Sequence, residues 1–227
     1  MRMDQVTCPP GGREDLEEII GATRRRIAWS LREKVGDGGF AVRSDPCLRE
    51  HVIHWPRPSG ASRPSYLEYL HELVHARLAE EAHPLFSGPV FAPGSSQGLV
   101  DAALPVFQAA SDWFVEHEVL RLCPERKKPE LAAQHEVVLQ CLRGSGSLDP
   151  ARAACTALMA AKATWLGREP GFTGLLADLC QAYLRTPAHK PSLFTLRALA
   201  NRLLPPLFQA RAEVVVARGR EAWLLKS

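Results

Sequence analysis

His71-Glu72-Leu73-Val74-His75 is an H-E-x-x-H pattern, and the interpretation of the whole chain starts from this stretch. On a helix the two histidines are four residues apart, so both imidazoles project from one face and can bind one metal ion, typically zinc. Glu72 follows His71 directly and is placed to take a proton from a water molecule bound to that ion. The pattern therefore predicts a zinc site with His71 and His75 as ligands and Glu72 as general base.

The sequence around the pattern predicts a helix over residues 65–82, with Pro84 just past its end. Apolar residues surround the two histidines, as a buried helix at an active site requires. These residues are Leu70, Leu73, Val74 and Leu78. The alternative is an exposed helix that carries two histidines by chance.

The composition is typical of a globular protein. The chain has 227 residues, of which 46% are hydrophobic and 23% are charged, enough to bury a core in one large domain or two small ones. The net charge of +3 is too small to indicate a nucleic-acid partner. No run approaches the roughly 18 apolar residues of a membrane span, and residues 1–18 lack the apolar segment of a secretory signal. We therefore expect no membrane partner.

The cysteines do not indicate a metal or redox motif. All six are widely spaced and none form C-x-x-C, so neither a zinc ribbon nor a dithiol redox site is indicated. A chain of this size with a normal core does not need disulfides. We expect reduced thiols and a cytoplasmic location.

Upstream of the H-E-x-x-H helix, the sequence predicts one helix and two strands. Residues 13–34 have apolar residues near helical spacing, with acids early and bases late, which suits the helix dipole. Residues 40–43 and 51–55 are candidate strands, separated by the turn signal Asp45-Pro46. The two strands predict a small β-sheet.

Downstream, residues 84–98 are irregular, and residues 99–123 form a strong second helix. From Pro129 onward the pattern is helical throughout. The predicted helices cover 129–143, 149–166, 171–186, 191–203 and 205–223. We expect an α+β fold, predominantly helical, with an α+β unit at residues 1–125 and a helical region at residues 126–227. No long linker separates them, so they can pack as one domain.

A catalytic zinc ion takes three protein ligands and leaves one position open, so the site needs a third ligand. A third histidine six residues after His75 would complete a three-histidine site, but Glu81 occupies that position. The helix at residues 99–123 is a better source. On a helical wheel, Asp112 and Glu116 fall inside its broad apolar arc.

Buried carboxylates are costly unless they are paired or bound to a metal. Asp112 and Glu116 are one turn apart on the apolar arc, so they call for a cation. The alternative to a metal ion is a buried arginine that pairs with one of them. The opposite, polar side of the helix carries Ser111, His117, Glu118 and Arg121.

These features resemble gluzincin-like zinc metallopeptidases of the compact minigluzincin type. The resemblance rests on the pattern at 71–75, the strand at 51–55 and the segment Ala-Ser-Asp-Trp-Phe-Val-Glu at 110–116, and it covers about residues 13–124. It implies a zincin-like unit in which residues 51–55 form an edge strand that holds an extended substrate.

The resemblance also implies the third ligand. Asp112 would bind zinc, and Glu116 would hold His71 from outside the coordination sphere. Most gluzincins have Glu where this chain has Asp, so the two roles can be exchanged. A second register, over residues 116–119, is similar to phage-regulator peptidases and would use Glu118 instead.

We therefore predict a zinc-dependent metallopeptidase that hydrolyses peptide or protein substrates, with Glu72 passing the proton to the leaving amine. An electrophilic side chain should stabilise the oxyanion. The candidates are Tyr66, Tyr69, His54 and His117. The alternative is a non-catalytic zincin-fold protein that binds a partner through residues 126–227. A nucleic-acid-associated protease is disfavoured by the low net charge and the absence of a zinc ribbon.

Overall fold

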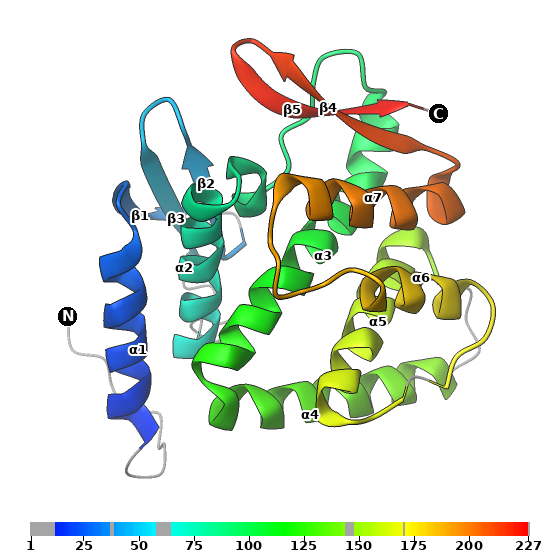
Figure 1. Ribbon diagram of the computed structural model, residues 1–227, viewed down its shortest axis with the longest axis horizontal. Helices are drawn as coiled ribbons and strands as arrows, with labels where there is room; N and C mark the ends of the chain where they lie inside the picture. The colour runs from blue at the N-terminus through cyan, green and yellow to red at the C-terminus, as the bar shows by residue number, and fades with distance from the viewer. Residues whose placement is uncertain (1–11, 37–38, 58–64, 144–147, 170, 227) are drawn as a thin grey trace.

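The computed structural model describes residues 12–36, 39–57, 65–143, 148–169 and 171–226. Over these ranges the fold is α+β and predominantly helical, with seven α-helices, a three-stranded sheet and a two-stranded hairpin. Figure 1 shows the sheet beside the first two helices, the long third helix through the middle, and the other helices and the hairpin beyond it. No helix in the described ranges is long and apolar enough to cross a bilayer.

The predicted helix over residues 13–34 is wrong in its last part. Helix α1 covers Gly12–Arg26, and the chain then continues as strand β1, Ser30–Gly36. Strand β1 pairs in parallel with β3, Glu50–Pro56. This pairing is between segments distant in sequence, so it overrides the helical spacing that the segment shows locally.

The other two strand predictions are confirmed, but the strand predicted at residues 51–55 does not lie at the edge of the sheet. Strand β2 covers Ala41–Asp45 and runs antiparallel to β3. The order is β1-β3-β2, so β3 lies in the centre. The expectation that residues 51–55 form an edge strand is therefore wrong, because both sides of β3 are already paired.

Helix α2, Tyr66–Glu81, carries the H-E-x-x-H pattern and matches the predicted helix. It begins with a capping box in which the Ser65 side chain accepts a hydrogen bond from Glu68 N and the Glu68 carboxylate accepts one from Ser65 N. These two bonds satisfy backbone donors that a helix start leaves unpaired. Its apolar side is fully buried at Leu70, Leu73 and Val74.

Glu80, near the end of α2, provides the physical reason for the early end of α1. Its carboxylate accepts hydrogen bonds from the backbone N–H groups of Ala28 (2.9 Å) and Trp29 (2.8 Å). It also accepts one from the buried His51 ring on β3, at 2.8 Å. Backbone donors bound to Glu80 cannot continue the helix, so the chain turns into β1.

The predicted helix at 99–123 is observed as α3, Gln97–Leu122. The segment before it holds a 3-10 helix, η1, at Pro84–Ser87. The next helices lie close to the predicted ranges, and a second 3-10 helix, η2, follows α5. They are α4 (Pro124–Arg143), α5 (Pro150–Ala163), η2 (Thr164–Leu166), α6 (Leu175–Leu184) and α7 (Leu193–Phe208).

The predicted helix over residues 205–223 is wrong. Helix α7 continues to Phe208, and the chain then forms an antiparallel hairpin of β4, Arg211–Ala217, and β5, Arg220–Lys226. Arg218 and Gly219 connect the strands, both with positive φ (52° and 75°), as tight two-residue hairpins require. The β-branched run Val214-Val215-Val216 favours a strand over a helix.

The hairpin is attached to the segment between α2 and α3. Trp223 is fully buried and packs on Phe107, with ring centroids 4.8 Å apart. Its backbone donates to Val90 O (2.7 Å) and accepts from Ala92 N (2.8 Å). A third attachment, from Leu225 N to the Ser95 hydroxyl, is 3.0 Å long. The segment that follows the H-E-x-x-H helix is therefore fixed by the last strand.

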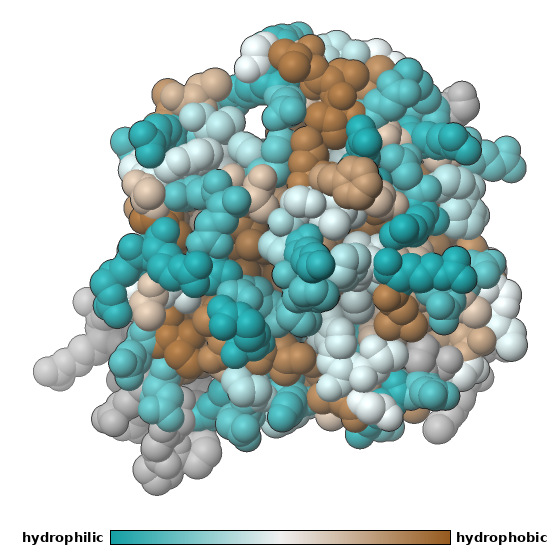
Figure 2. All heavy atoms as spheres, in the orientation of Figure 1, coloured by the Kyte–Doolittle hydropathy of each residue, from teal (hydrophilic) through white to brown (hydrophobic). Residues whose placement is uncertain are grey.

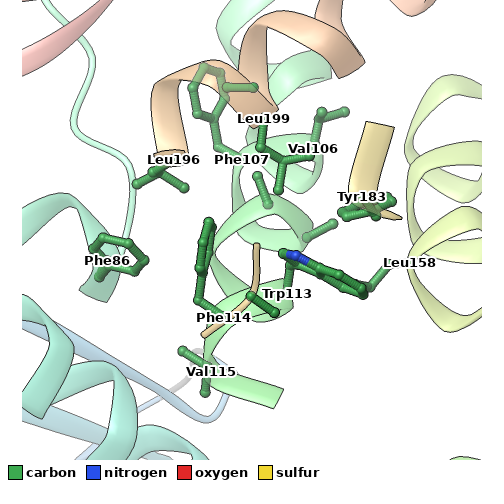
Figure 3. Close-up of a cluster of buried hydrophobic side chains, with 14 of the residues drawn as sticks. Phe86, Val106, Phe107, Trp113, Phe114, Val115, Leu158, Tyr183, Leu196 and Leu199 are labelled. Carbon is green, nitrogen blue, oxygen red and sulfur yellow. The ribbon is translucent and has the colours of Figure 1, made fainter. Parts of the chain in front are cut away.

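A single cluster of buried side chains extends from α1 to β5. Figure 3 shows its middle, where Phe86 meets Phe114 edge to face and Trp113 lies beside Tyr183. On the face drawn in Figure 2, hydrophobic residues reach the surface in groups between hydrophilic ones. The apolar burial that stabilises the fold thus joins the N-terminal sheet, the helices and the hairpin.

Trp223→Ala should lower the free energy of unfolding by about 3–5 kcal/mol, because it removes a fully buried aromatic side chain. Urea denaturation followed by circular dichroism measures the change. Val216→Ala is the control, since Val216 is 76% exposed on the same hairpin, and it should cost less than about 0.5 kcal/mol. Equal effects of the two substitutions would mean that the hairpin is not part of the cooperatively folded core.

Candidate metal centre

Three ligand-type atoms from α2 and α3 converge on one point. His71 Nε2 and His75 Nε2 are 3.0 Å apart. Asp112 Oδ1 lies 3.1 Å from His75 Nε2 and 3.5 Å from His71 Nε2. Within the described ranges, these residues form the one group of three or more that could hold a metal ion.

Each histidine faces an acceptor with its other nitrogen. His75 Nδ1 lies 2.6 Å from the carbonyl oxygen of Phe86 in η1. A carbonyl can only accept, so Nδ1 carries the hydrogen. His71 Nδ1 faces Glu116 Oε1 at 3.2 Å, and a carboxylate also accepts. In the neutral rings, both Nε2 atoms therefore present lone pairs toward Asp112.

The convergence of these acceptors favours a positive charge among them. Burial alone would lower the pKa of His71, but hydrogen bonds and charges from Asp112 and Glu116 outweigh it and raise this pKa to about 10. Burial alone would raise the pKa of Asp112, but the two histidines hold it well below its ordinary value. The surroundings thus favour positive charge at this point, from a proton or from a metal ion.

The spacing of the three atoms fits zinc. Tetrahedral zinc with bonds of about 2.0–2.1 Å to nitrogen or oxygen places neighbouring ligand atoms about 3.3 Å apart. The three observed separations, 3.0, 3.1 and 3.5 Å, lie close to that value. Two imidazoles and a carboxylate also match the donor types that zinc accepts. The Asp112 side chain is 32% exposed, so water reaches the group from this side.

Glu116 lies behind His71 and does not converge with the three atoms. Burial alone would raise the pKa of Glu116, but Lys162, His71 and Lys127 hold it well below its ordinary value. The sequence left open that a buried arginine pairs with Asp112 or Glu116. Among the residues that the structure describes, no arginine does so, and two lysines pair with Glu116 instead.

Glu72 is buried and is oriented by strand β2. Its Oε2 accepts a hydrogen bond from the backbone N–H of Val42, at 2.7 Å. Its Oε1 has no hydrogen-bond partner among the described residues. Because Val42 donates to Glu72 and not to β3, the unpaired edge of β2 lies next to this carboxylate.

Two of the candidate oxyanion stabilisers are engaged elsewhere. The Tyr69 hydroxyl donates to Glu33 (2.8 Å) and accepts from Arg24 (2.9 Å). The His117 ring packs edge-on against Trp165, with centroids 5.5 Å apart.

The other two candidate oxyanion stabilisers are His54 and Tyr66. His54 alternates along β3 with the buried Ile53, so its side chain lies on the sheet face away from α2. Tyr66 lies in the first turn of α2.

Glu118, the ligand of the second register, is not at the metal group. Its carboxylate pairs with the buried Arg77 of α2 at 2.5 Å and with Arg121 at 2.7 Å. Burial alone would raise the pKa of Glu118, but these two guanidinium groups lower it to about 2. The polar side of α3 is therefore partly covered by α2, whose Arg77 supplies the positive charge that pairs with Glu118.

Sequence reasoning missed three groups that support the site. The Phe86 carbonyl is a backbone atom, which no residue pattern identifies. Lys127 was indistinguishable from its charged neighbours in residues 124–130. Lys162 did leave a signal, because it is a lone charge in the apolar run at 153–163. Comparisons with protein-family models, with curated proteins and with solved structures gave no match.

The raised pKa of His71 predicts that zinc binding depends on pH. Below about pH 10 a proton occupies this ring unless a cation displaces it. The apparent zinc affinity should therefore rise about tenfold per pH unit between about pH 6 and pH 8, as one proton is released. Zinc titration against a chelator of known pH dependence measures the slope. An affinity that stays constant over this range would contradict displacement of a proton from His71.

Proposed function

We propose that this protein is a zinc-dependent metallopeptidase. The observation that carries the proposal is the convergence of His71 Nε2, His75 Nε2 and Asp112 Oδ1, whose separations suit one zinc ion. Bound zinc would supply a Lewis acid that lowers the pKa of a coordinated water to about 7 and polarises a carbonyl. Asp112 is the proposed third ligand, and Glu116 the residue that orients His71.

Glu72 is the proposed general base. Its Oε2 is held by Val42 N–H, which leaves Oε1 to accept a proton from the attacking water. The water oxygen forms the new bond to the carbonyl carbon, the C–N bond breaks, and Glu72 delivers the proton to the leaving amine. His75, fixed by the Phe86 carbonyl, and His71, fixed by Glu116, stay in place throughout.

The position of β2 supports a peptide as the substrate class. This strand pairs with β3 on one side and lies next to Glu72 on the other. An extended peptide adds to a sheet edge through backbone hydrogen bonds. A peptide aligned along β2 would pass beside Glu72. Strand β2 would then hold the extended substrate, the role that the family resemblance implies for residues 51–55.

The metal site is tested by zinc content. Purified protein should hold about one zinc ion per chain, because three ligands with a supporting hydrogen-bond network bind zinc tightly. His75→Ala and Asp112→Ala should each lose most of it, as measured by plasma mass spectrometry after dialysis. His189→Ala is the control, since His189 is exposed and outside the group. Wild-type protein without stoichiometric zinc would reject both the ligand set and the mechanism.

Catalysis is tested separately with Glu72→Gln. This change should keep zinc bound but slow the cleavage of fluorescence-quenched peptides by about 10²–10⁴-fold, because it removes the general base. Glu81→Gln, on the same helix and more exposed, is the control and should retain activity. Zinc-loaded wild type that cleaves no faster than Glu72→Gln would reject the peptidase proposal and favour a non-catalytic metal-binding protein.

A further inference from the structure

A cluster of four charges, three of them buried, lies behind His71. Lys127 Nζ is 2.7 Å from Glu116 Oε2 and 2.8 Å from Glu130 Oε1. Lys162 Nζ is 3.4 Å from the same Glu116 oxygen. Two ammonium groups and two carboxylates therefore compensate one another, with Glu116 at the centre of the cluster.

Both lysines are more deeply buried than this residue type usually is. Lys127 is 2% exposed and Lys162 is 4% exposed, whereas lysines are almost never fully buried unless they are paired. Removing such charges from water costs free energy even when the pairs are good. The mechanism proposed for Glu72 uses neither lysine, so their burial needs another explanation.

The geometry connects the lysines to the metal centre. Glu116 faces His71 Nδ1 with Oε1 and faces both ammonium groups with Oε2. The contacts at Oε2 are ion pairs without hydrogen-bond geometry, and they restrain the rotation of the carboxylate and with it the position of Oε1. Oε1 in turn fixes the His71 ring with Nε2 toward His75 and Asp112.

We propose that Lys127 and Lys162 are positioning residues of the metal centre, which act on His71 through Glu116. Lys127 lies on α4 and Lys162 on α5, so the helical region beyond residue 125 forms part of the site. The inference rests on the proposed function, because it takes zinc as the ion held by His71. The opposite view is that the lysines only neutralise a buried acid during folding.

Lys127→Met and Lys162→Met test the proposal through zinc affinity, which needs no substrate. Loss of outer partners of metal-bound histidines weakens metal binding by about 10–100-fold, and each substitution should weaken it by about tenfold. Lys128→Met is the matched control, because Lys128 is the exposed neighbour of Lys127 on the same helix. Circular dichroism checks the fold, and two independent lysine variants guard against one that does not fold.

The direction in which zinc affinity changes when a lysine is replaced distinguishes a positioning role from simple charge repulsion. An ammonium group near zinc repels it, so repulsion alone predicts tighter zinc binding when a lysine is removed. Positioning predicts weaker binding. Folded lysine variants with unchanged or higher zinc affinity would overturn the inference.

A double-mutant cycle tests the path through Glu116. In a Glu116→Gln variant the two lysines have no carboxylate through which to position His71. Adding Lys162→Met to this variant should therefore change zinc affinity less than about twofold. An equal loss with and without Glu116 would mean that Lys162 acts on the fold as a whole, and the inference would be overturned. Failure of the proposed function differs visibly, because wild type itself would then bind no zinc.

Discussion

The central constraint in this protein is that α2 and α3 hold three ligand-type atoms around one point. His71, His75 and Asp112 direct these atoms toward one another at hydrogen-bonding distances, and a shared cation would remove their mutual repulsion. The arrangement persists only if α2 and α3 keep a fixed spacing. Apolar packing between the helices provides part of that spacing, and the ion pair between Arg77 and Glu118 ties the same two helices on their polar side. The metal group is thus a property of the helix pair and not of the motif alone.

Other parts of the fold each hold one member of the site. Strand β2 orients Glu72 through a backbone N–H, and η1 orients His75 through a carbonyl. The hairpin at the end of the chain fixes the segment that contains η1, since Trp223 pairs with its backbone. Helices α4 and α5 reach Glu116 through their lysines. Contacts made far apart in sequence therefore support three residues of the site, which are Glu72, His75 and Glu116.

Local patterns predicted the parts of this arrangement that local chemistry determines. The histidine spacing, the start of α2 near Ser65 and the apolar arc of α3 are all set within a few residues, and the helices follow them. Strand β1 could not be predicted in this way. The helix before it, α1, ends because Glu80, about fifty residues later in the sequence, accepts the backbone hydrogen bonds of Ala28 and Trp29. The hairpin has a readable signal in its run of three valines, because β-branched residues favour strands. The support of His75 by the Phe86 carbonyl depends on tertiary packing and has no sequence signature.

The two acids of α3 show how environment separates residues that a helical wheel treats alike. Asp112 and Glu116 lie one turn apart on the same arc, and the sequence allowed their roles to be exchanged. In the structure two lysines compensate the charge of Glu116. Asp112 has no lysine or arginine partner among the described residues, and its ion-pair partners there are the two histidines. Its charge therefore remains available to a metal ion, whereas a metal ion bound by Glu116 would have to displace the ammonium groups. This difference in compensation, more than the difference between Asp and Glu, favours Asp112 as the ligand.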